Sequence, residues 1–313
     1  MKKILVTGGA GYIGSHTICD LLAHGFEVIS IDNYSRSSAT VWSGIEAISG
    51  IRVKNYDIDL CDRRALSEVL EKEHPLAGLI HFAAYKSVEE SVHHPLMYYR
   101  NNLESLMNLL ELAEAYQIPH FVFSSSCSVY GNIQHLPVNE NTPLAKPESP
   151  YAATKQMGEQ MIQDFSKNAR SRFLALRYFN PVGAHPTASI GEMPQGKPSN
   201  LFPSITQTAA GKQAVLKVWG SDYPTRDGTC IRDYIHVMDI ARAHTMSLEY
   251  LMNKPEQPPF DLFNVGSGEG VSVKEAVAAF ETVSGLILPV QYDNRRPGDV
   301  ISIYSDSTKI LKA

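Results

Sequence analysis

The chain has 313 residues, of which 43% are hydrophobic and 19% charged, with a formal net charge of −5. This composition supports a packed core and argues against intrinsic disorder. Acidic side chains outnumber basic ones by 33 to 28, which argues against a general nucleic-acid binder. No apolar run approaches the roughly 20 residues of a membrane-spanning helix, so no membrane partner is expected.

The cysteines and histidines show no metal-binding or disulfide pattern. The four cysteines are widely scattered and include no C-x-x-C pair, and the eleven histidines lack the spacing of common metal ligands. We therefore expect no disulfide framework and no metal site. Scattered thiols also favour a reducing compartment, so a cytoplasmic location is expected.

Short apolar runs alternate with helical patterns through the first half of the chain. We expect strands at 4–6, 28–31, 51–53, 79–82, 121–123 and 173–176, and helices at 13–23, 62–73, 103–116 and 151–165. This alternation predicts an α/β fold, a Rossmann-type doubly wound parallel sheet with helices on both faces. Strands in such a sheet are buried on both sides, which explains their continuous apolar character.

The pattern changes after residue 180. Residues 180–200 are rich in Pro and Gly and are expected to form a loop, followed by a helix at 237–251 and a strand at 262–265. We expect one lobe over 1–180, rejoined by about 234–266. A smaller, discontinuous C-terminal lobe takes up the remainder of 181–313.

A glycine-rich turn lies between the first strand and the first helix. Gly8, Gly11 and Gly14 form G-x-x-G-x-x-G, which lets the backbone approach a pyrophosphate at a helix N-terminus. The second strand ends at Asp32, where a carboxylate would accept from ribose hydroxyls and repel a 2′-phosphate, favouring NAD over NADP. Two alternatives stay open: an ordinary strand–helix turn, and a loop cap at Asp32.

Tyr151 and Lys155 stand four residues apart at the start of a predicted helix, so both lie on one face. A lysine ammonium favours the phenolate of a nearby tyrosine, which then suits proton abstraction from an alcohol. Y-x-x-x-K alone is also common on solvated helix faces. Here it follows Ser126, at the carboxyl end of a predicted parallel strand, where such sheets bind ligands. The three residues are the predicted catalytic set.

Six motifs carry a resemblance to a known family: VTGGAGYIGSH at 6–16, IHFAA at 80–84, FSSSCSVYG at 123–131, SPYAATK at 149–155, RYFNPVGAHP at 177–186 and IRDYIHVMD at 231–239. Across nearly the whole chain, the sequence resembles the extended short-chain dehydrogenase/reductase family. Within it, the chain is most similar to enzymes that interconvert UDP-glucose and UDP-galactose with a tightly bound NAD. The resemblance implies a UDP-sugar substrate, bound partly by the smaller lobe, and a homodimer.

The resemblance also implies site residues. Those expected to bind NAD are Gly8, Gly11, Tyr12, Ile13, Gly14, Asp32, Asn33, Ser37, Asp57, Ile58, Phe82, Ala83, Ala84, Lys86, Asn101, Ser124, Tyr151, Lys155 and Tyr178. Those expected to bind the UDP-sugar are Ser126, Tyr151, Phe179, Asn180, Asn200, Leu201, Trp219, Arg232, Arg296 and Asp299. For Arg232, an ion pair with Asp233 or another acid is the alternative.

Other activities on this fold remain open. Ile303 falls where the resemblance implies a gate to the hexose pocket, so an N-acetylhexosamine or uronate 4-epimerase is an alternative. The related 4,6-dehydratases usually carry an Asp-Glu pair after the catalytic Ser or Thr, and Cys127-Ser128 stands here instead. A non-catalytic dinucleotide sensor is a further alternative, although such a protein would be expected to lose the Tyr or the Lys.

Overall fold

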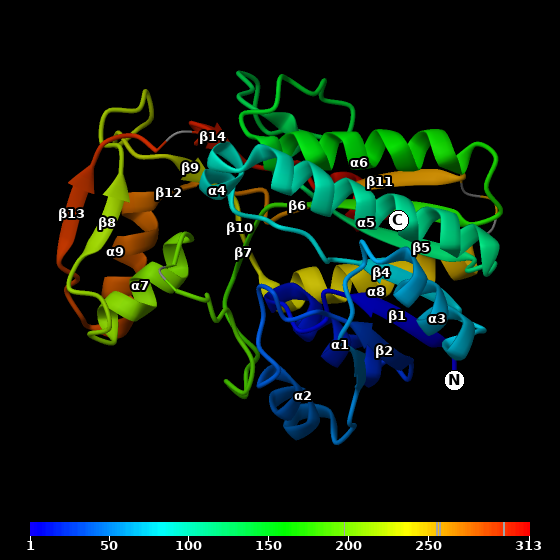
Figure 1. Ribbon diagram of the computed structural model, residues 1–313. Helices are drawn as coiled ribbons and strands as arrows, with labels where there is room; N and C mark the ends of the chain where they lie inside the picture. Colours follow the sequence, from blue (N-terminus) through cyan, green and yellow to red (C-terminus); the bar gives the residue numbers. More distant parts are fainter. Residues whose placement is uncertain (197, 255, 257, 297) are drawn as a thin grey trace.

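The computed structural model describes residues 1–196, 198–254, 256, 258–296 and 298–313, and its centre is a parallel seven-stranded sheet (Figure 1). The strand order is β11-β6-β5-β4-β1-β2-β3. The strands are β1 (Lys3–Thr7), β2 (Glu27–Ile31), β3 (Lys54–Tyr56), β4 (Gly78–His81), β5 (His120–Ser126), β6 (Arg172–Tyr178) and β11 (Phe260–Val265). The predicted doubly wound α/β fold is confirmed.

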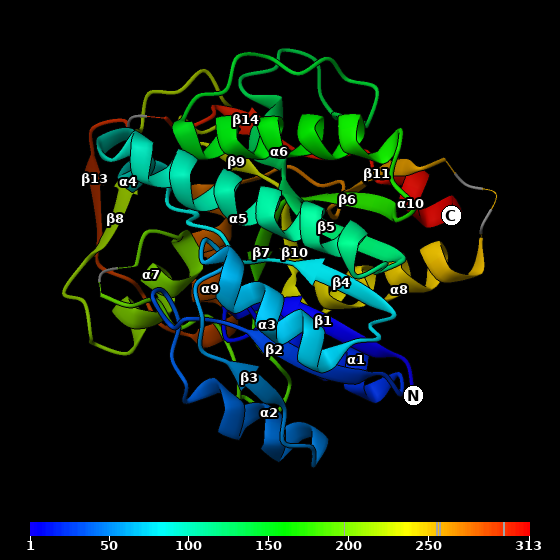
Figure 2. The same ribbon diagram turned by 45° about the vertical axis from the view of Figure 1, so that its right-hand side comes forward.

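Helices cover both faces of this sheet (Figure 2). One face carries α1 (Tyr12–Ala23), α2 (Val41–Ser49) and α8 (Val237–Asn253), and the other carries α3 (Arg63–Glu73), α5 (Pro95–Ala115) and α6 (Pro150–Ser166). The short helix α4 (Val88–His93) precedes α5, and the 3-10 turn η1 (Cys127–Tyr130) follows β5.

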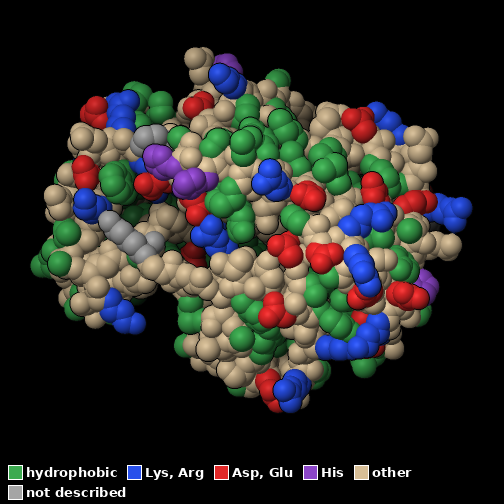
Figure 3. All heavy atoms as spheres, in the orientation of Figure 1, with side chains coloured by type: hydrophobic (Ala, Val, Ile, Leu, Met, Phe, Trp, Pro, Cys, Tyr) green, Lys and Arg blue, Asp and Glu red, His purple; other side chains and the backbone are tan. Residues whose placement is uncertain are grey.

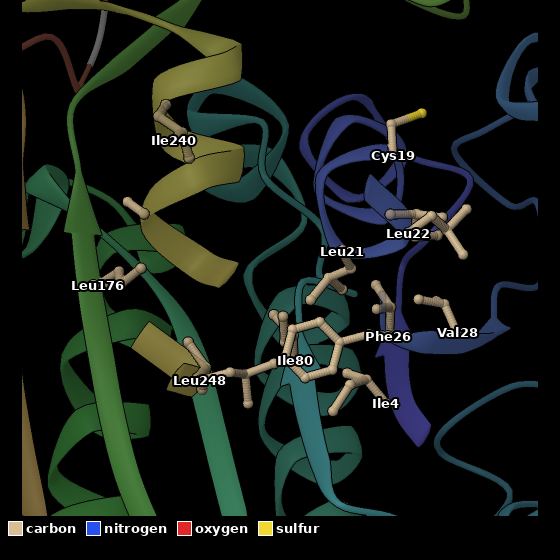
Figure 4. Close-up of a cluster of buried hydrophobic side chains, with 14 of the residues drawn as sticks. Ile4, Cys19, Leu21, Leu22, Phe26, Val28, Ile80, Leu176, Ile240 and Leu248 are labelled. Atoms are coloured by element: carbon tan, nitrogen blue, oxygen red, sulfur yellow. The ribbon is translucent and has the colours of Figure 1, made fainter. Parts of the chain in front are cut away.

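Two apolar layers explain why the strands are continuously apolar. Figure 4 shows Ile4 and Ile80 of the sheet packed with Leu21 of α1 and Leu248 of α8. The next residue of β1, Leu5, points to the opposite layer. Successive side chains of a strand alternate between faces, and both faces are covered, so both Ile4 and Leu5 are fully buried.

A smaller group of elements lies beside the carboxyl ends of these strands, at the left of Figure 1. It has its own apolar cluster, formed by Ile205, Leu216, Val218, Val277 and Leu288. Its elements are α7 (Leu201–Ala209), β8 (Leu216–Trp219), β9 (Ile231–Arg232), β12 (Val271–Ser272), α9 (Val273–Ser284), β13 (Val290–Asp293) and β14 (Ser302–Ile303). The pair β7 (Asn180–Val182) and β10 (Tyr234–His236) runs between the two groups, and α10 (Thr308–Lys312) packs on β11. The division of the chain at residue 180 stays a proposal.

Three secondary-structure predictions were wrong. The loop expected over 180–200 begins with the strand β7, which pairs with β10. The strand expected at 51–53 is displaced to β3, the edge strand, where Lys54 to Tyr56 pair with β2. An edge strand needs less apolar surface, so the apolar Ile51, which is 47% exposed, misled the prediction. The helix expected from 103 begins earlier, at Pro95. Pro lacks a backbone N–H and is therefore accepted at the first position of a helix, where that group would have no partner.

Other elements carried no sequence prediction. They are α2, α4, η1 and, after residue 180, α7, β8, β9, β10, β12, α9, β13, β14 and α10. Within the described part of the chain, no helix is both long and apolar enough to cross a bilayer.

Candidate active site

The glycine-rich turn joins β1 to α1 with no room for side chains. Gly8 has φ +73°, and a Cβ there would lie 2.7 Å from the backbone nitrogen of Ala83, at the end of β4. A Cβ at Gly14 would fall on the carbonyl oxygen of Gly8. The turn closes with a 3.0 Å hydrogen bond from Gly11 N to Gly8 O. A bare turn at the start of α1 fits a pyrophosphate.

Asp32 follows β2 and connects this turn to the next loop. Its Oδ2 accepts from Ala10 N at 3.0 Å, and its Oδ1 accepts from Tyr34 N at 2.9 Å and Ser37 Oγ at 2.7 Å. Each carboxylate oxygen has two lone pairs, so Oδ2 retains capacity for a ribose hydroxyl, while the charge would repel a 2′-phosphate. The turn and this carboxylate together fit NAD.

The predicted catalytic residues come together where β5 meets α6. Ser126 ends β5 and accepts from Ser128 N at 3.2 Å, and Tyr151 lies in the first turn of α6. Ser149 caps that helix by accepting from Ala152 N at 3.2 Å, which fixes where the helix begins. Ser126, Tyr151 and Lys155 all line the same cavity.

Burial changes the proton affinity of both titratable members of this set. It raises the pKa of Tyr151, and a hydrogen bond with Ser126 acts in the opposite direction. Burial also lowers the pKa of Lys155 to about 8, although the negative charge of Glu159 opposes this shift. From the sequence, only the effect of the ammonium on the pKa of the phenol was expected. The structure adds desolvation, which disfavours both charged forms.

The lysine is held by the strand beneath it. Lys155 Nζ donates to the carbonyl oxygen of Ser124 at 2.6 Å and lies 4.8 Å from the centre of the Phe123 ring. The hydroxyl of Ser124 is 2.6 Å from the hydroxyl of Tyr178 on β6. Ser124 therefore positions two cavity-lining side chains without lining the cavity itself.

Two arginines and one aspartate face the cavity from the smaller lobe. Arg296 Nη2 donates to Asp299 Oδ1 at 2.9 Å, and Arg232 Nη2 lies 3.7 Å from the same oxygen. Asp233 does not pair with Arg232. It is fully buried and accepts from Ser267 and Ser305, so Asp233 is excluded as the ion-pair partner of Arg232. The alternative of an ion pair with another acid is met by Asp299. Arginine side chains suit a diphosphate by charge and donor geometry.

One cavity of about 1520 Å³ joins these groups, and Figure 3 shows the surface hollowed between the smaller lobe and the rest of the molecule. All but two of the predicted site residues line it. Besides the catalytic set, they are Gly8, Gly11, Tyr12, Ile13, Gly14, Asp32, Asn33, Ser37, Ile58, Phe82, Ala83, Ala84, Lys86, Asn101, Tyr178, Phe179, Asn180, Asn200, Leu201, Trp219, Arg232, Arg296 and Asp299. Asp57, which is exposed, and Ser124, which is buried, do not line it.

The sequence analysis missed Glu192, which lies in the loop after β7 and lines the cavity. Its carboxylate accepts from Lys86 Nζ at 3.4 Å and from Asn200 Nδ2 at 2.6 Å. It thus joins a residue predicted to bind the cofactor to one predicted to bind the substrate. No motif signals this contact, because Lys86 and Glu192 are 106 positions apart.

In the part of the chain that the structure describes, no three His, Cys, Asp or Glu side chains are grouped to hold a metal ion.

Comparison with known proteins agrees with this geometry. The NAD dependent epimerase/dehydratase family profile matches residues 4–266. The chain is 47% identical over 307 residues to the UDP-glucose 4-epimerase of Bacillus subtilis (strain 168), covering 98% of this chain and 89% of that protein. The structure is similar to UDP-glucose 4-epimerase from Bifidobacterium longum in complex with NAD⁺ and UDP. The TM-score is 0.94 at 40% identity, covering 99% of this chain and 92% of the other.

A second solved structure is the UDP-Glc/GlcNAc 4-epimerase of Campylobacter jejuni. Its TM-score is 0.83 at 39% identity, covering all of this chain and 92% of the other. The family profile extends from β1 through β11, so it includes the whole central sheet. The chain belongs to the NAD dependent epimerase/dehydratase family.

Proposed function

We propose that this protein interconverts UDP-glucose and UDP-galactose, using bound NAD, by transient oxidation of the hexose at C4. The observation that carries the proposal is a single cavity lined at one end by the glycine turn, near β5 by Ser126 and Tyr151, and at the other end by two arginines. The 47% identity to the Bacillus subtilis UDP-glucose 4-epimerase supports the choice of substrate.

Tyr151 is the proposed acid–base group. Its phenolate oxygen takes the proton of the C4 hydroxyl, and Ser126 Oγ hydrogen-bonds that oxygen as the 4-ketose forms. When the ketone is reduced from its other face, Tyr151 returns the proton to the oxygen. Burial opposes ionisation of this phenol, so the ammonium of Lys155, one helical turn along α6, must stabilise the phenolate.

The glycine turn, Asp32, Lys155 and Tyr178 would hold NAD, which when bound accepts a hydride from C4 and later returns it. Tyr12 supports this end of the cavity. Its hydroxyl donates to the carbonyl oxygen of Gly183 at 2.6 Å and so connects α1 to the loop after β7.

Arg232 and Arg296 would bind the diphosphate of the UDP-sugar. The anchored diphosphate keeps the 4-ketose in the cavity while the hexose turns about its linkage to present its other face. Both guanidinium groups are partly buried, with 15% and 23% of their side chains exposed, so their charge is screened less than that of surface arginines.

The direct test is incubation of the purified protein and NAD with UDP-galactose, with the C4 configuration of the product read by NMR. Formation of UDP-glucose is expected. If the protein binds NAD and no UDP-glucose forms, the proposal is contradicted.

A second substrate class is favoured by one observation. Ile303 is 3% exposed, lines the cavity and packs in one apolar cluster with Phe179. Its side chain is smaller than that of a tyrosine, and the similar Campylobacter jejuni protein is a UDP-Glc/GlcNAc 4-epimerase. Parallel incubations with UDP-N-acetylgalactosamine and UDP-galacturonate would distinguish the alternatives.

We also propose that the protein is a cytoplasmic homodimer. Leu96 and Met107 of α5 and Met157 of α6 are exposed apolar side chains on two helices that pack together, and Figure 3 shows apolar side chains gathered over these helices. Large apolar patches on a surface are typical of protein interfaces. Light scattering of the purified protein tests the dimer, and a mass of one chain would contradict it.

A further inference from the structure

A buried polar network lies under the catalytic helix α6, at its third turn. Three side chains stand in one row across the sheet, because Ser125 of β5 pairs in register with Arg177 of β6, and Arg177 pairs with Asn264 of β11. Glu159 reaches this row from α6. All four are at most 7% exposed.

Glu159 is bound by three donors. Arg177 donates from Nε at 2.9 Å and from Nη2 at 2.6 Å, one to each carboxylate oxygen, and Ser125 Oγ also donates to the carboxylate. An ionised carboxylate only accepts hydrogen bonds, so three donors match its charged form.

Arg177 also contacts Tyr130 of η1. Its guanidinium lies 4.8 Å from the centre of the Tyr130 ring, and Tyr130 OH donates to Asn264 Oδ1 at 2.7 Å. The network therefore connects α6 to three strands.

Strand β5 also holds Lys155, through Ser124, the residue before Ser125. The carbonyl of Ser124 accepts from Lys155, and the hydroxyl of Ser125 donates to Glu159, so consecutive residues of β5 bind consecutive turns of α6. Lys155 and Glu159 are four residues apart and lie on one face of the helix.

We propose that Glu159 is a positioning residue for the reaction: its buried carboxylate keeps the neighbouring Lys155 in the ammonium form and, through Ser125 and Arg177, fixes the rotation of α6 that aims Tyr151 into the cavity. This inference rests on the proposed function, because it concerns the lysine that stabilises the Tyr151 phenolate.

The other groups around Lys155 are uncharged near neutral pH. The titratable and charged groups there are Tyr151 and Glu159 on α6, His81 on β4, Tyr98 on α5, Cys127 in η1, and Arg177 and Tyr178 on β6. Burial lowers the pKa of His81 to about 3 and raises the pKa values of Cys127 and Tyr178 to about 12. Burial also raises the pKa of Tyr98. Within this set, Glu159 and Arg177 are charged, and Glu159 is the group whose charge raises the pKa of the ammonium.

The test compares the pH dependence of turnover of UDP-galactose in the NAD-bound protein and in Glu159→Gln. Glu159 favours the ammonium, so its loss should move the fall in kcat at alkaline pH downward by about one pH unit or more. Glu159→Asp, which retains a carboxylate, should restore most of the shift. Asp164→Asn removes an exposed acid from the same helix and should leave the profile unchanged.

A purely structural Glu159 would give a different result. Glu159→Gln would then lower stability or kcat while the alkaline limb stays at the pH of the parent protein, and this would overturn the proposal. If Glu159→Gln fails to fold because Arg177 is left unpaired, Glu159→Gln/Arg177→Met is compared with Arg177→Met alone, so that the two proteins differ only at Glu159, and the alkaline limb of the double variant should lie at lower pH.

A measurement without turnover separates this inference from the proposed function. Titration of ¹³Cε-labelled lysines by NMR follows the Lys155 signal directly, assigned by its absence in Lys155→Met. A lower pKa of Lys155 in Glu159→Gln supports the inference even if no UDP-sugar is converted. An unchanged value contradicts it even if the protein is an active epimerase.

Discussion

The two ends of the cavity are built from different kinds of contact. At the glycine turn, the surface is backbone, held by parallel strands in fixed register, and Gly8 packs against the end of β4 without a side chain. At the smaller lobe, the surface is side chain, and Arg232, Arg296 and Asp299 hold one another by ion pairs.

This difference fits two ligands with different demands. A cofactor that stays bound benefits from a rigid site, because little ordering is left to occur on binding. A hexose that must turn between two chemical steps needs one anchored end and room at the other. At the smaller lobe, a diphosphate can replace Asp299 as the partner of the two arginines. The backbone turn has no side chain that can change its partner in this way.

The largest loss of turnover should follow from substitution of Tyr151, which lies between the two ends of the cavity. Tyr151→Phe removes the acid–base oxygen while keeping the ring, and a positioned acid–base group contributes typically about 10²–10⁴-fold. We expect kcat to fall by that factor and bound NAD to be retained. Tyr292→Phe, on exposed β13, is the matched control and should be fully active. Full activity of Tyr151→Phe would reject the assignment.

At the side-chain end, Arg296→Met should weaken substrate binding. Hydrogen bonds to charged groups contribute about 1.5–3 kcal/mol, so we expect KM for UDP-galactose to rise about 10–150-fold, with bound NAD unchanged. The adjacent Arg295 pairs with Asp222 outside the cavity, so Arg295→Met should leave KM near the parent value. Equal effects of the two substitutions would contradict the proposed diphosphate site.

At the backbone end, Gly8→Ala should weaken NAD binding. Its Cβ would collide with the backbone of Ala83, and overpacking of this kind costs about 1–3 kcal/mol. Gly25→Ala is the control, because Gly25 has a similar φ of +77° with nothing within 4 Å of the added Cβ. The NAD content of the purified proteins should fall in Gly8→Ala alone. If both variants lose NAD equally, the loss comes from backbone strain at a positive φ and not from the close contact between Gly8 and Ala83.

The smallest effect, a change in stability alone, should come from Glu73, which lies beside the edge strand β3 and away from the cavity. Burial raises the pKa of Glu73, but hydrogen bonds from Lys54, Tyr56 and Lys3 outweigh it and lower the pKa to about 2. The carboxylate therefore stabilises the fold above its unfolded-state value near 4.5, and this contribution is lost as pH falls through about 2.

Glu73→Gln should accordingly reduce the free energy of unfolding at pH 7 by on the order of 1 kcal/mol, with kcat unchanged. Urea unfolding at pH 7 and pH 3 measures the difference, which should shrink at the lower pH. A constant difference would show that packing, not charge, accounts for the loss.

The sequence was most informative where function depends on the ends of parallel strands. Gly8, Asp32 and Ser126 each follow or end an apolar run, and parallel strands bring their carboxyl ends to one edge, so the chain order alone places these residues together. Each of the three is marked by a short, continuous stretch of sequence, and all three line one cavity in the structure.

The rest depended on contacts between distant segments. Glu192 joins Lys86 and Asn200 across two loops, and Glu159 reaches Arg177 only because α6 packs across β5 and β6. No periodicity or spacing marks such pairs. The strand misplaced at Ile51 failed for a related reason, because an edge strand is selected by pairing with β2 rather than by its own apolar content.

The central claim is that the hydride leaves C4 and returns to C4 within one site. Conversion of UDP-glucose deuterated at C4 tests it most directly, with the label in the product located by NMR. The expected product is UDP-galactose that keeps the deuterium at C4. Product carrying solvent hydrogen at C4, or label retained in UDP-glucose with no epimer formed, would contradict it.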